Sequence, residues 1–362
     1  MKRSFLIAAI AFTYVTSVAQ TKEFSITGTA PQGSANNSYV YLNDVSTKKK
    51  VDSTLVKDGK FTFSGKTEGN SVYSITMGRM GKPFILEGGN IIVDFANQKI
   101  GGTPLNEIYD KYEKEVGEIQ KNVKEEQQKM GSDKSVNEAD RRAKSGELFK
   151  IANDKTTEIA LNYMKSNKDN AAGALIFNHC IRGVIRDNKE LFDKFYSNAG
   201  DYVKKFPSVA QAASRFEALD KTRVGMPFVD FTIKNGNPDG SSVSFSDYIG
   251  KGKYILVDFW ASWCGPCKAE IPNIAAVYNE FKGDKFDVLS IAVWDEREKT
   301  IKSAIEHKVV WNQIIDAQNI PTDLYGISGI PQIMLFGPDG KIVAKGIRGA
   351  NVRKAVAEAL GK

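Results

Sequence analysis

The chain is poor in cysteine and histidine, because its 362 residues include three cysteines and two histidines. An exported protein held together by disulfides would carry more cysteines at more even spacing, so a structural disulfide framework is excluded. A zinc site would need further ligands at suitable spacing beside a cysteine pair, and neither His179 nor His307 belongs to such a motif. We therefore expect neither a metal nor a cofactor.

Long hydrophobic runs are also lacking after the first residues. Lys2 and Arg3 precede an apolar segment at 5–15, and the small residues at 17–19 suit a signal peptidase. This pattern predicts a signal peptide at 1–19, cleaved after Ala19, and export to the periplasm or cell envelope; a retained anchor is the alternative. Because no later run reaches about 18 apolar residues, we expect a soluble mature chain.

One kind of charge pattern is missing as well. The formal net charge is +7, and it falls to about +5 when Lys2 and Arg3 leave with the signal peptide. The excess is spread over a mixed lysine and glutamate surface and forms no basic stripe with interleaved aromatic residues. The sequence therefore gives no indication of nucleic-acid binding.

Residues 22–100 are predicted to form a small antiparallel β-sandwich domain. Apolar and polar residues alternate in short segments, separated by turn signals such as Asp58-Gly59 and Gly88-Gly89. No cluster of catalytic residue types stands out, so we interpret the region as a structural or binding module. The predicted strands are 24–28, 39–42, 60–64, 71–77 and 90–95.

Residues 104–222 are predicted to form a helical domain. A second amphipathic run at 138–164 follows a break at 131–133, which indicates an antiparallel helical hairpin. The first run has apolar residues at alternating spacings of three and four, interrupted by Glu126. We expect this seam to pack within the chain, and a homodimer through the helical domain is the alternative. The seam residues are Tyr109, Tyr112, Val116, Ile119, Val123 and Met130.

The next predicted helix, at 171–184, is more apolar and carries Cys180. A buried free thiol behaves as a small hydrophobe, so we interpret Cys180 as inert. Pairing with a cysteine of a partner chain is the alternative. Shorter helices are predicted at 191–196 and 209–219.

Residues 224–362 alternate between strand and helix signals, which indicates an α/β domain whose sheet is covered by helices. The segment at 226–228 opens this domain. Strands are predicted at 254–259, 286–293 and 311–315, and a hairpin at 332–336 and 342–345. Helices are predicted from Cys264 to 281 and at 299–307 and 352–360.

The segment at 255–268, I-L-V-D-F-W-A-S-W-C-G-P-C-K, carries the clearest chemical signal. A buried strand, a sharp turn and a helix start follow one another, so Cys264 is predicted at a helix N-terminus. There, unpaired backbone N–H groups and the helix dipole stabilise the nucleophilic thiolate. Cys267 lies one helical turn further on, close enough to bond the first sulfur. Gly265 is interpreted as permitting the tight turn, and Pro266 as stiffening the first helical turn.

This segment resembles thioredoxin almost residue for residue. The sequence Y-G-I-S-G-I-P at 325–331 resembles the loop that carries the cis-proline of that family, opposite the cysteine pair. The resemblance therefore implies a cis peptide bond before Pro331, and an Ile330 backbone that pairs with an extended substrate segment. The substrate-binding residues that we predict are Trp263, Gly265, Pro266, Ile330 and Pro331.

The wider pattern resembles the exported TlpA/ResA-like branch of the thioredoxin superfamily, which is related to the AhpC/TSA-type fold. The leading segment at 226–228 and an extra helix and strand at about 295–316 carry this resemblance. Glu270 matches the buried glutamate of that branch, and Asp258 matches the buried aspartate of thioredoxin. The resemblance implies that either carboxylate accepts the proton of Cys267. The predicted catalytic residues are Cys264, Cys267, Glu270 and Asp258.

Two further expectations come from the same resemblance. The lysine that accompanies the aspartate in thioredoxin aligns with Val293, so either Asp258 is more strongly desolvated or Glu270 has taken over its role. Trp260 and Trp263 are expected to shape an apolar rim around the sulfurs. The N-terminal β-region resembles, through the segment at 84–89, an uncharacterised module that often precedes such domains, and it carries over no site residue.

The predicted function is that of an exported thiol–disulfide oxidoreductase that reduces or isomerises protein disulfides. The Gly-Pro dipeptide is that of thioredoxin, whose potential is about −270 mV, which favours a reductase or isomerase over a strong oxidant. A reductase in an oxidising compartment needs a membrane electron donor of the thiol–disulfide relay type. The resemblance suggests cytochrome c maturation or the rescue of wrong disulfides.

Two rival functions belong to other classes. A thioredoxin-fold peroxidase would carry threonine three residues before its peroxidatic cysteine, where this chain has Ala261. A non-enzymatic envelope binding protein would use the β and helical regions to hold a ligand or partner. The intact C-G-P-C sequence argues against such an inert fold.

Overall fold

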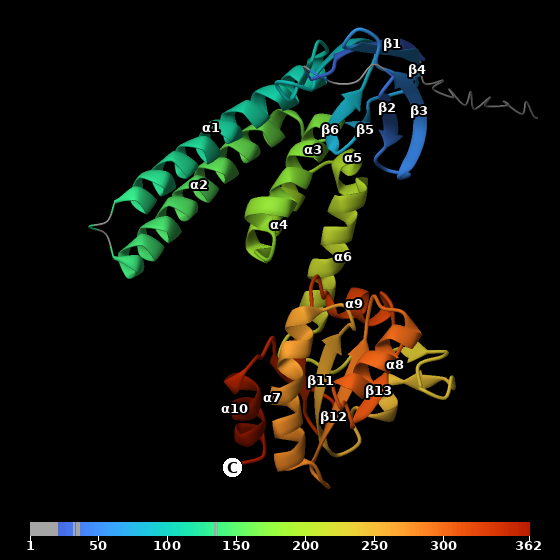
Figure 1. The fold of residues 1–362 in the computed structure, drawn as a ribbon, viewed down its shortest axis with the longest axis vertical. Helices are drawn as coiled ribbons and strands as arrows, with labels where there is room; N and C mark the ends of the chain where they lie inside the picture. Colours follow the sequence, from blue (N-terminus) through green and yellow to red (C-terminus); the bar gives the residue numbers. More distant parts are fainter. Residues whose placement is uncertain (1–20, 32, 34–36, 134, 136) are drawn as a thin grey trace, which may run out of the picture. The chain divides into compact units, whose positions relative to one another are not determined.

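The computed structural model describes residues 21–31, 33, 37–133, 135 and 137–362. The predicted signal peptide at 1–19 lies outside the described residues. Within the described part of the chain, no helix combines the length and the apolar character that crossing a membrane requires. The chain divides into two compact units, of which the first ends at Val209 and the second begins at Ala210 (Figure 1).

The first unit begins with a β-sandwich, as the sequence predicts. Within the described residues its strands form two four-stranded sheets, in the orders β4-β1-β7-β8 and β3-β2-β5-β6. Apolar residues of both sheets, including Ile26 and Ile75, share one buried cluster, because alternate residues of each strand point inward. The pairing is antiparallel except between β1 and β7, which run parallel. The strands are Lys22–Thr29 (β1), Tyr39–Asp44 (β2), Lys49–Leu55 (β3), Lys60–Thr67 (β4), Ser71–Met77 (β5), Met80–Leu86 (β6), Gly89–Asp94 (β7) and Lys99–Gly101 (β8).

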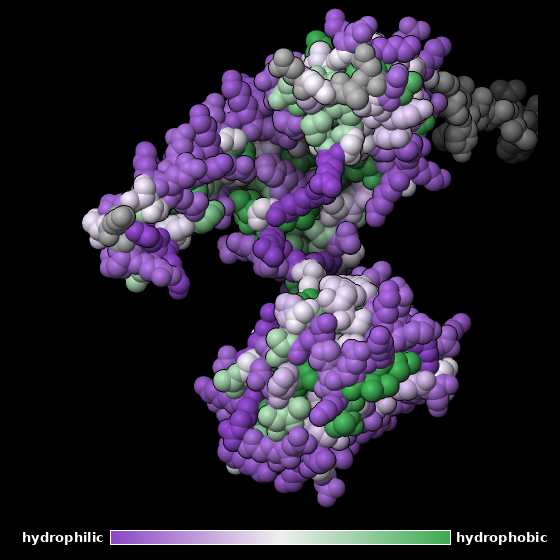
Figure 2. All heavy atoms as spheres, in the orientation of Figure 1, coloured by the Kyte–Doolittle hydropathy of each residue, from purple (hydrophilic) through white to green (hydrophobic). Residues whose placement is uncertain are grey.

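Helices make up the rest of the first unit, and α1 and α2 form the predicted antiparallel hairpin (Figure 1). Tyr109, Tyr112 and Val116 of the seam are buried, whereas Ile119 and Val123 are half-buried. The seam therefore packs within the chain at its start, and the hairpin surface in view is largely hydrophilic (Figure 2). The helices are Pro104–Ser132 (α1), Glu138–Ser166 (α2), Ala171–Cys180 (α3), the π-helix Ile181–Ile185 (η1), Lys189–Asn198 (α4), Asp201–Lys205 (α5) and Pro207–Lys221 (α6), the last of which belongs to the second unit from Ala210 onward.

Hydrogen bonds join the β-sandwich to the first helix. The Glu87 carboxylate accepts from the backbone N–H groups of Leu105 and Asn106 at 2.8 and 3.2 Å, as suits an acidic group at a helix N-terminus. The Asn106 side chain accepts from the Ile85 N–H at 2.9 Å and donates to the Ile85 carbonyl at 2.7 Å. The sandwich and the hairpin thus belong to one compact unit, and their separation into two domains remains a prediction.

The second unit is the predicted α/β fold. In residues 210–362, all of which the structure describes, a five-stranded sheet has the order β13-β12-β11-β14-β15. Figure 2 shows a mostly hydrophilic face, with hydrophobic side chains gathered over α8 and β13. The elements are Thr232–Ile233 (β9), Val243–Ser244 (β10), the 3-10 helix Phe245–Asp247 (η2), Tyr254–Trp260 (β11), Gly265–Phe281 (α7), Phe286–Ala292 (β12), Arg297–Glu306 (α8), Asn312–Ile314 (β13), Ile320–Tyr325 (α9), Gln332–Phe336 (β14), Ile342–Lys345 (β15) and Ala350–Ala359 (α10).

Strand β11 lies in the middle of this sheet and has apolar clusters on both faces. Val257 and Phe259 join one cluster with Tyr325, while Leu256 and Trp260 join another that includes residues of α7 and α10. A strand that is buried on both faces reads as a continuous apolar run, which is why its prediction is accurate. This burial makes β11 a rigid support for the loop at 261–263 that follows it.

The boundary between the units lies within α6, upstream of the boundary that we expected at 222–224. Arg215 Nε donates to the Gly326 carbonyl at 3.3 Å, and Lys345 Nζ donates to the Thr222 hydroxyl at 3.1 Å. The C-terminal part of α6 therefore packs as part of the second unit. Helix periodicity locates the helix itself, but it carries no information on the unit against which each turn packs.

Candidate active site

The two cysteines of the C-G-P-C sequence form a disulfide at the start of α7. Cys264 is the N-cap residue of the helix, and its sulfur accepts a hydrogen bond from the Cys267 backbone N–H at 3.2 Å. Both side chains are buried, with 4% and 0% of their surface exposed. Among the described residues, no group of three or more histidine, cysteine and acidic side chains is arranged to hold a metal ion. The pair is therefore placed for thiol–disulfide chemistry at a helix N-terminus.

The two residues between the cysteines are exposed, and they occupy the first turn of α7. Pro266 suits this turn because its missing N–H would have no partner within the helix. At Gly265 a Cβ would meet nothing within 4 Å apart from its chain neighbours and the backbone of its own helix, and its φ lies outside the left-handed region. The backbone turn therefore does not require glycine at this position, and the predicted substrate contact of both residues remains a prediction.

Asp258 lies on β11 and is 1% exposed. It pairs in register with Ile333, which belongs to the same apolar cluster as the two cysteines. Within the described residues its Oδ1 has no hydrogen-bond partner. Burial, followed by the negative charge of Glu270, raises the pKa of Asp258 to about 8. Val293, which aligns with the lysine in the resemblance to thioredoxin, is buried in the core. Because a valine side chain is uncharged, it supplies no positive charge to Asp258.

Glu270 lies on α7 and is half-buried, so it is less enclosed than the resemblance implies. Its Oε2 accepts from the backbone N–H of Gly349 at 3.0 Å and from the Asn273 amide at 3.1 Å. Gly349 has a φ of 55° and a ψ of −133°, a conformation that favours glycine. The carboxylate of Glu270 is thus held in place and lies close enough to Asp258 to influence its charge.

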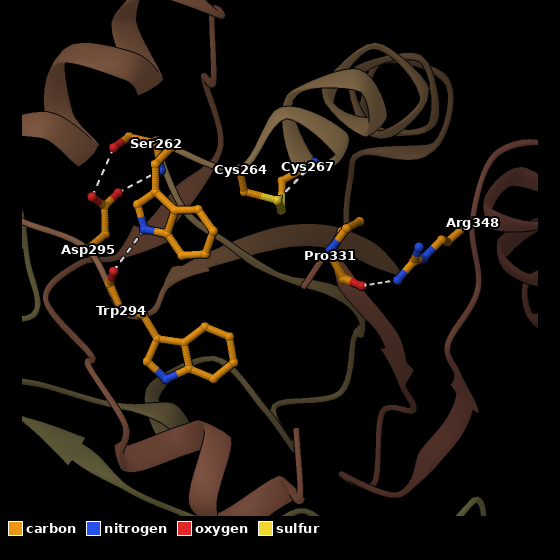
Figure 3. Close-up of a disulfide and its surroundings, with 8 residues drawn as sticks. Ser262, Cys264, Cys267, Trp294, Asp295, Pro331 and Arg348 are labelled. Atoms are coloured by element: carbon orange, nitrogen blue, oxygen red, sulfur yellow. Dashed lines mark hydrogen bonds between the residues drawn. A yellow bond between two sulfur atoms is a disulfide. The ribbon is translucent and has the colours of Figure 1, made fainter. Parts of the chain in front are cut away.

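The Ile330–Pro331 peptide bond is cis, as the resemblance implies. Ile330 packs against the apolar cluster that contains both cysteines. Arg348 donates to the Pro331 carbonyl at 2.6 Å, and Figure 3 shows Pro331 between that arginine and the disulfide. The structure therefore brings the cis-proline loop to the cysteine pair, and substrate pairing at Ile330 remains a prediction.

The two tryptophans expected at the rim differ in their environment. Trp263 is 59% exposed, and its indole N–H donates to the Trp294 carbonyl at 2.9 Å. Trp260 is 1% exposed and lies in the apolar core, so its predicted place at the rim is wrong. The error has a simple cause: Trp260 is the last residue of a central strand, whereas Trp263 lies on the loop beyond it.

Asp295, a buried acidic residue between β12 and α8, is a part of the site that the sequence did not predict. Its carboxylate accepts from the Ser262 backbone N–H at 2.6 Å and from the Ser262 hydroxyl at 2.9 Å. Ser262 and Asp295 are 33 residues apart, so no local pattern links them. An acidic residue at the end of a buried strand was the signal that could have found this contact. Figure 3 shows Asp295 and Trp294 on the side of the disulfide opposite Arg348.

Comparison with protein families finds two matches along the chain. Residues 224–345 match the AhpC/TSA family, and residues 24–109 match a domain of unknown function, DUF4369. The second match agrees with the resemblance of the β-region to an uncharacterised module and adds no site residue.

Individual relatives match part of the chain. The thiol-disulfide oxidoreductase ResA of Bacillus subtilis is 27% identical over 35% of this chain and 69% of its own length. The ResA of Oceanobacillus iheyensis is 33% identical over 33% of this chain, and the chain spans 62% of that relative. The solved thioredoxin domain of a thiol-disulfide oxidoreductase from Bacteroides vulgatus is 36% identical, over 38% of this chain and 96% of that domain, with a TM-score of 0.34. The C-terminal unit of the chain is therefore a thioredoxin-like domain of the AhpC/TSA family and of the TlpA/ResA type of thiol-disulfide oxidoreductase.

Proposed function

We propose that the chain is an exported enzyme that reduces or isomerises protein disulfides through Cys264 and Cys267. The observation that carries this proposal is the cysteine pair at the N-terminus of α7, with Cys264 as the N-cap residue. A thiolate at this position is stabilised by the free N–H groups of the first helical turn. The cis-proline loop next to the pair supports the proposal, because it offers a backbone edge to an extended polypeptide.

The reaction has two exchange steps. In the first, the Cys264 thiolate attacks one sulfur of the substrate disulfide, the substrate S–S bond breaks, and the departing sulfur takes up a proton. In the second, the deprotonated Cys267 attacks the Cys264 sulfur, and the second substrate sulfur leaves and is protonated. The substrate gains two electrons and two protons, and the enzyme becomes the disulfide that the structure contains.

Asp258 is our proposed acceptor for the Cys267 proton, with Glu270 as a supporting charge. A carboxyl group with a pKa of about 8 is basic enough to take a proton from a thiol near neutral pH. Glu270 contributes by raising that pKa. The hydrogen bonds from Gly349 and Asn273 hold its carboxylate at the edge of the site.

The cellular setting belongs to the same proposal. The charge and apolar pattern of residues 1–19 supports export to the periplasm or cell envelope. There, re-reduction of the enzyme disulfide requires a dithiol donor, which we propose is a membrane protein of the thiol–disulfide relay type. Cytochrome c maturation or disulfide rescue would supply the protein substrates, and a homodimer through the helical hairpin remains part of the proposal.

Trapping of the first intermediate tests the function. In Cys267→Ser the second step cannot occur, so the full-length protein should accumulate a mixed disulfide at Cys264 that mass spectrometry of the exported fraction identifies. Cys264→Ser is the matched control, and it should trap nothing. If Cys267→Ser forms no adduct at Cys264 and the wild type reduces no protein disulfide in the presence of dithiothreitol, the proposal is wrong.

The peroxidase alternative is tested with the same proteins. Wild-type enzyme reduced with dithiothreitol should consume hydrogen peroxide no faster than Cys264→Ser does. Faster consumption that depends on Cys264 would favour the peroxidase, although Ala261 stands where such an enzyme needs threonine.

A further inference from the structure

Asp295 is a buried charged side chain for which the proposed reaction has no use. It is 6% exposed, and hydrogen bonds surround its carboxylate. One oxygen accepts from the Ser262 N–H at 2.6 Å and the Thr300 hydroxyl at 2.9 Å, and the other accepts from the Ser262 hydroxyl and the Glu296 N–H, both at 2.9 Å. These bonds tie the loop before Cys264 to the start of α8.

The backbone around Asp295 makes further bonds to the same region. The Trp294 carbonyl accepts from the Trp263 indole at 2.9 Å, and the Asp295 carbonyl accepts from the Gln318 side chain at 2.7 Å. Trp294 has a φ of 54°, which is uncommon for a bulky residue. Residues 294 and 295 together therefore hold the backbone and hydroxyl of Ser262 and the indole of Trp263, the two residues that precede Cys264.

Trp263, held by this hydrogen bond from its indole, forms part of an open surface next to the disulfide. A pocket of about 550 Å³ is lined by Trp263, Trp294, Asp295, Asp316 and Gln318, together with residues 296–299. Trp294 and Asp295, which line this pocket, lie on the side of the disulfide away from Pro331 in Figure 3. A polypeptide that reaches the Cys264 sulfur therefore has a second surface available, on the side away from Pro331.

We propose that Asp295 is a positioning residue for polypeptide substrates, because it fixes Trp263 and Trp294 as a docking surface for the chain that flanks the substrate disulfide. This inference rests on the proposed function. Asp295 makes and breaks no bond in the reaction. A loop without its carboxylate still carries Cys264, but Trp263 no longer has a fixed orientation, so a polypeptide that docks against it must order this side chain and binds more weakly.

The test compares a large and a small substrate on full-length Asp295→Asn, in which the side-chain amide cannot accept both hydrogen bonds from Ser262. The substrates are insulin, whose disulfides are embedded in polypeptide, and 5,5′-dithiobis(2-nitrobenzoate), which has no flanking chain. We expect the KM for insulin to rise about tenfold with kcat within about twofold. The rate with the small disulfide should stay within about twofold of the wild type.

Asp239→Asn is the matched control, because Asp239 accepts from the N–H and the hydroxyl of one serine, Ser241, and does not line the pocket. It should leave both rates unchanged. Ser262→Ala removes only the hydrogen bond from the hydroxyl, so it should raise the KM for insulin less than Asp295→Asn does. It replaces Asp295→Asn as the test variant if that protein fails to fold.

The outcomes separate the inference from the function on which it rests. Equal losses on both substrates would show that Asp295 supports only the fold, and an unchanged insulin KM in Asp295→Asn would show that the docking surface does not depend on it. Either result overturns the inference and leaves the oxidoreductase function intact. A wild type that reduces neither substrate would instead overturn the proposed function.

Discussion

Cys180 and Cys264 are both buried, and they differ in their place on a helix. Cys180 is 1% exposed and Cys264 is 4% exposed, so burial does not distinguish them. Cys180 is the last residue of α3, where the chain continues into the π-helix η1. Cys264 precedes the first turn of α7, and an N–H group of that turn donates to its sulfur.

The difference shows that local backbone donors decide what a buried cysteine can do. Burial raises the pKa of the Cys180 thiol to about 12, and the nearby Tyr112 hydroxyl, 3.8 Å from the sulfur, opposes this rise. The raised pKa keeps the Cys180 thiol protonated near neutral pH, which makes this cysteine a poor nucleophile. At Cys264 the free N–H groups of a helix N-terminus stabilise the thiolate instead.

The largest expected effect comes from removing the two redox sulfurs. Cys264→Ser should lower the rate of disulfide reduction to the uncatalysed background. No other cysteine occupies the N-cap position of α7, where a thiolate is stabilised. Cys267→Ser should keep the first exchange step and stop turnover. Stopped-flow measurement with insulin would separate the two steps. A first exchange step as fast in Cys264→Ser as in Cys267→Ser would contradict the assignment of Cys264 as the attacking sulfur.

A smaller effect is expected from the proposed proton acceptor. Asp258→Asn should slow the second exchange step about 10²-fold at pH 7, because a general base contributes on this scale. The wild-type rate should rise with pH as the base form appears and level off above about pH 8, whereas the variant should lack this inflection. Single-turnover kinetics between pH 5 and 9 would measure how the rate of the second exchange step depends on pH in both proteins.

Glu270→Gln is the matched comparison for the Asp258 variant. Because the charge of Glu270 helps to raise the Asp258 pKa, its removal should shift the inflection to lower pH and cost less in rate. A larger loss in Glu270→Gln than in Asp258→Asn would assign the proton acceptor to Glu270 instead.

The same carboxyl group predicts a dependence of stability on pH. The pKa of Asp258 is higher in the folded protein than its ordinary value of 3.8, so the folded state holds one more proton than the unfolded state between about pH 4 and 8. Its contribution to stability is therefore present below pH 4 and is lost as the pH rises to 8, by at most about 1.4 kcal/mol per pH unit. The free energy of unfolding of Asp258→Asn should therefore rise relative to that of the wild type as the pH increases from 4 to 8.

Urea unfolding can follow this effect in the full-length oxidised protein. All four tryptophans lie between 260 and 311, so their fluorescence reports on the second unit. A constant difference between the Asp258→Asn variant and the wild type from pH 4 to 8 would contradict the raised pKa. Asp287→Asn, a change in a half-buried acidic residue of the neighbouring strand β12, is a suitable control.

Much of the fold was predictable because it repeats a regular pattern. The buried strand β11, the helix α7 and the hairpin of β14 and β15 were located within one or two residues, since each has a continuous apolar run or clear turn residues. Strand β3 was missed because it is largely exposed and shows no alternation. Strand β6 was missed because it contains Pro83, which is tolerated at this edge of the sheet.

The site was predictable only where its residues are close in sequence or match a family motif. Cys264 and Cys267 needed nothing more than their spacing, and the cis peptide at Pro331 needed the resemblance. The hydrogen bonds between Ser262 and Asp295 were not predictable, because they join two loops that β12 and α7 separate in sequence. The exposure of Trp263 and the burial of Trp260 depend equally on where the strand ends.

The smallest expected effect tests the other half of the cysteine comparison. Cys180→Ala should leave disulfide reduction unchanged and lower the stability of the first unit by about 1–3 kcal/mol, because it opens a small cavity beside Tyr112. In the folded reduced wild type, iodoacetamide should label Cys264 far faster than Cys180, as peptide mass spectrometry would show. Rapid labelling of Cys180, or a loss of activity in Cys180→Ala, would mean that its buried position on α3 does not make this thiol inert.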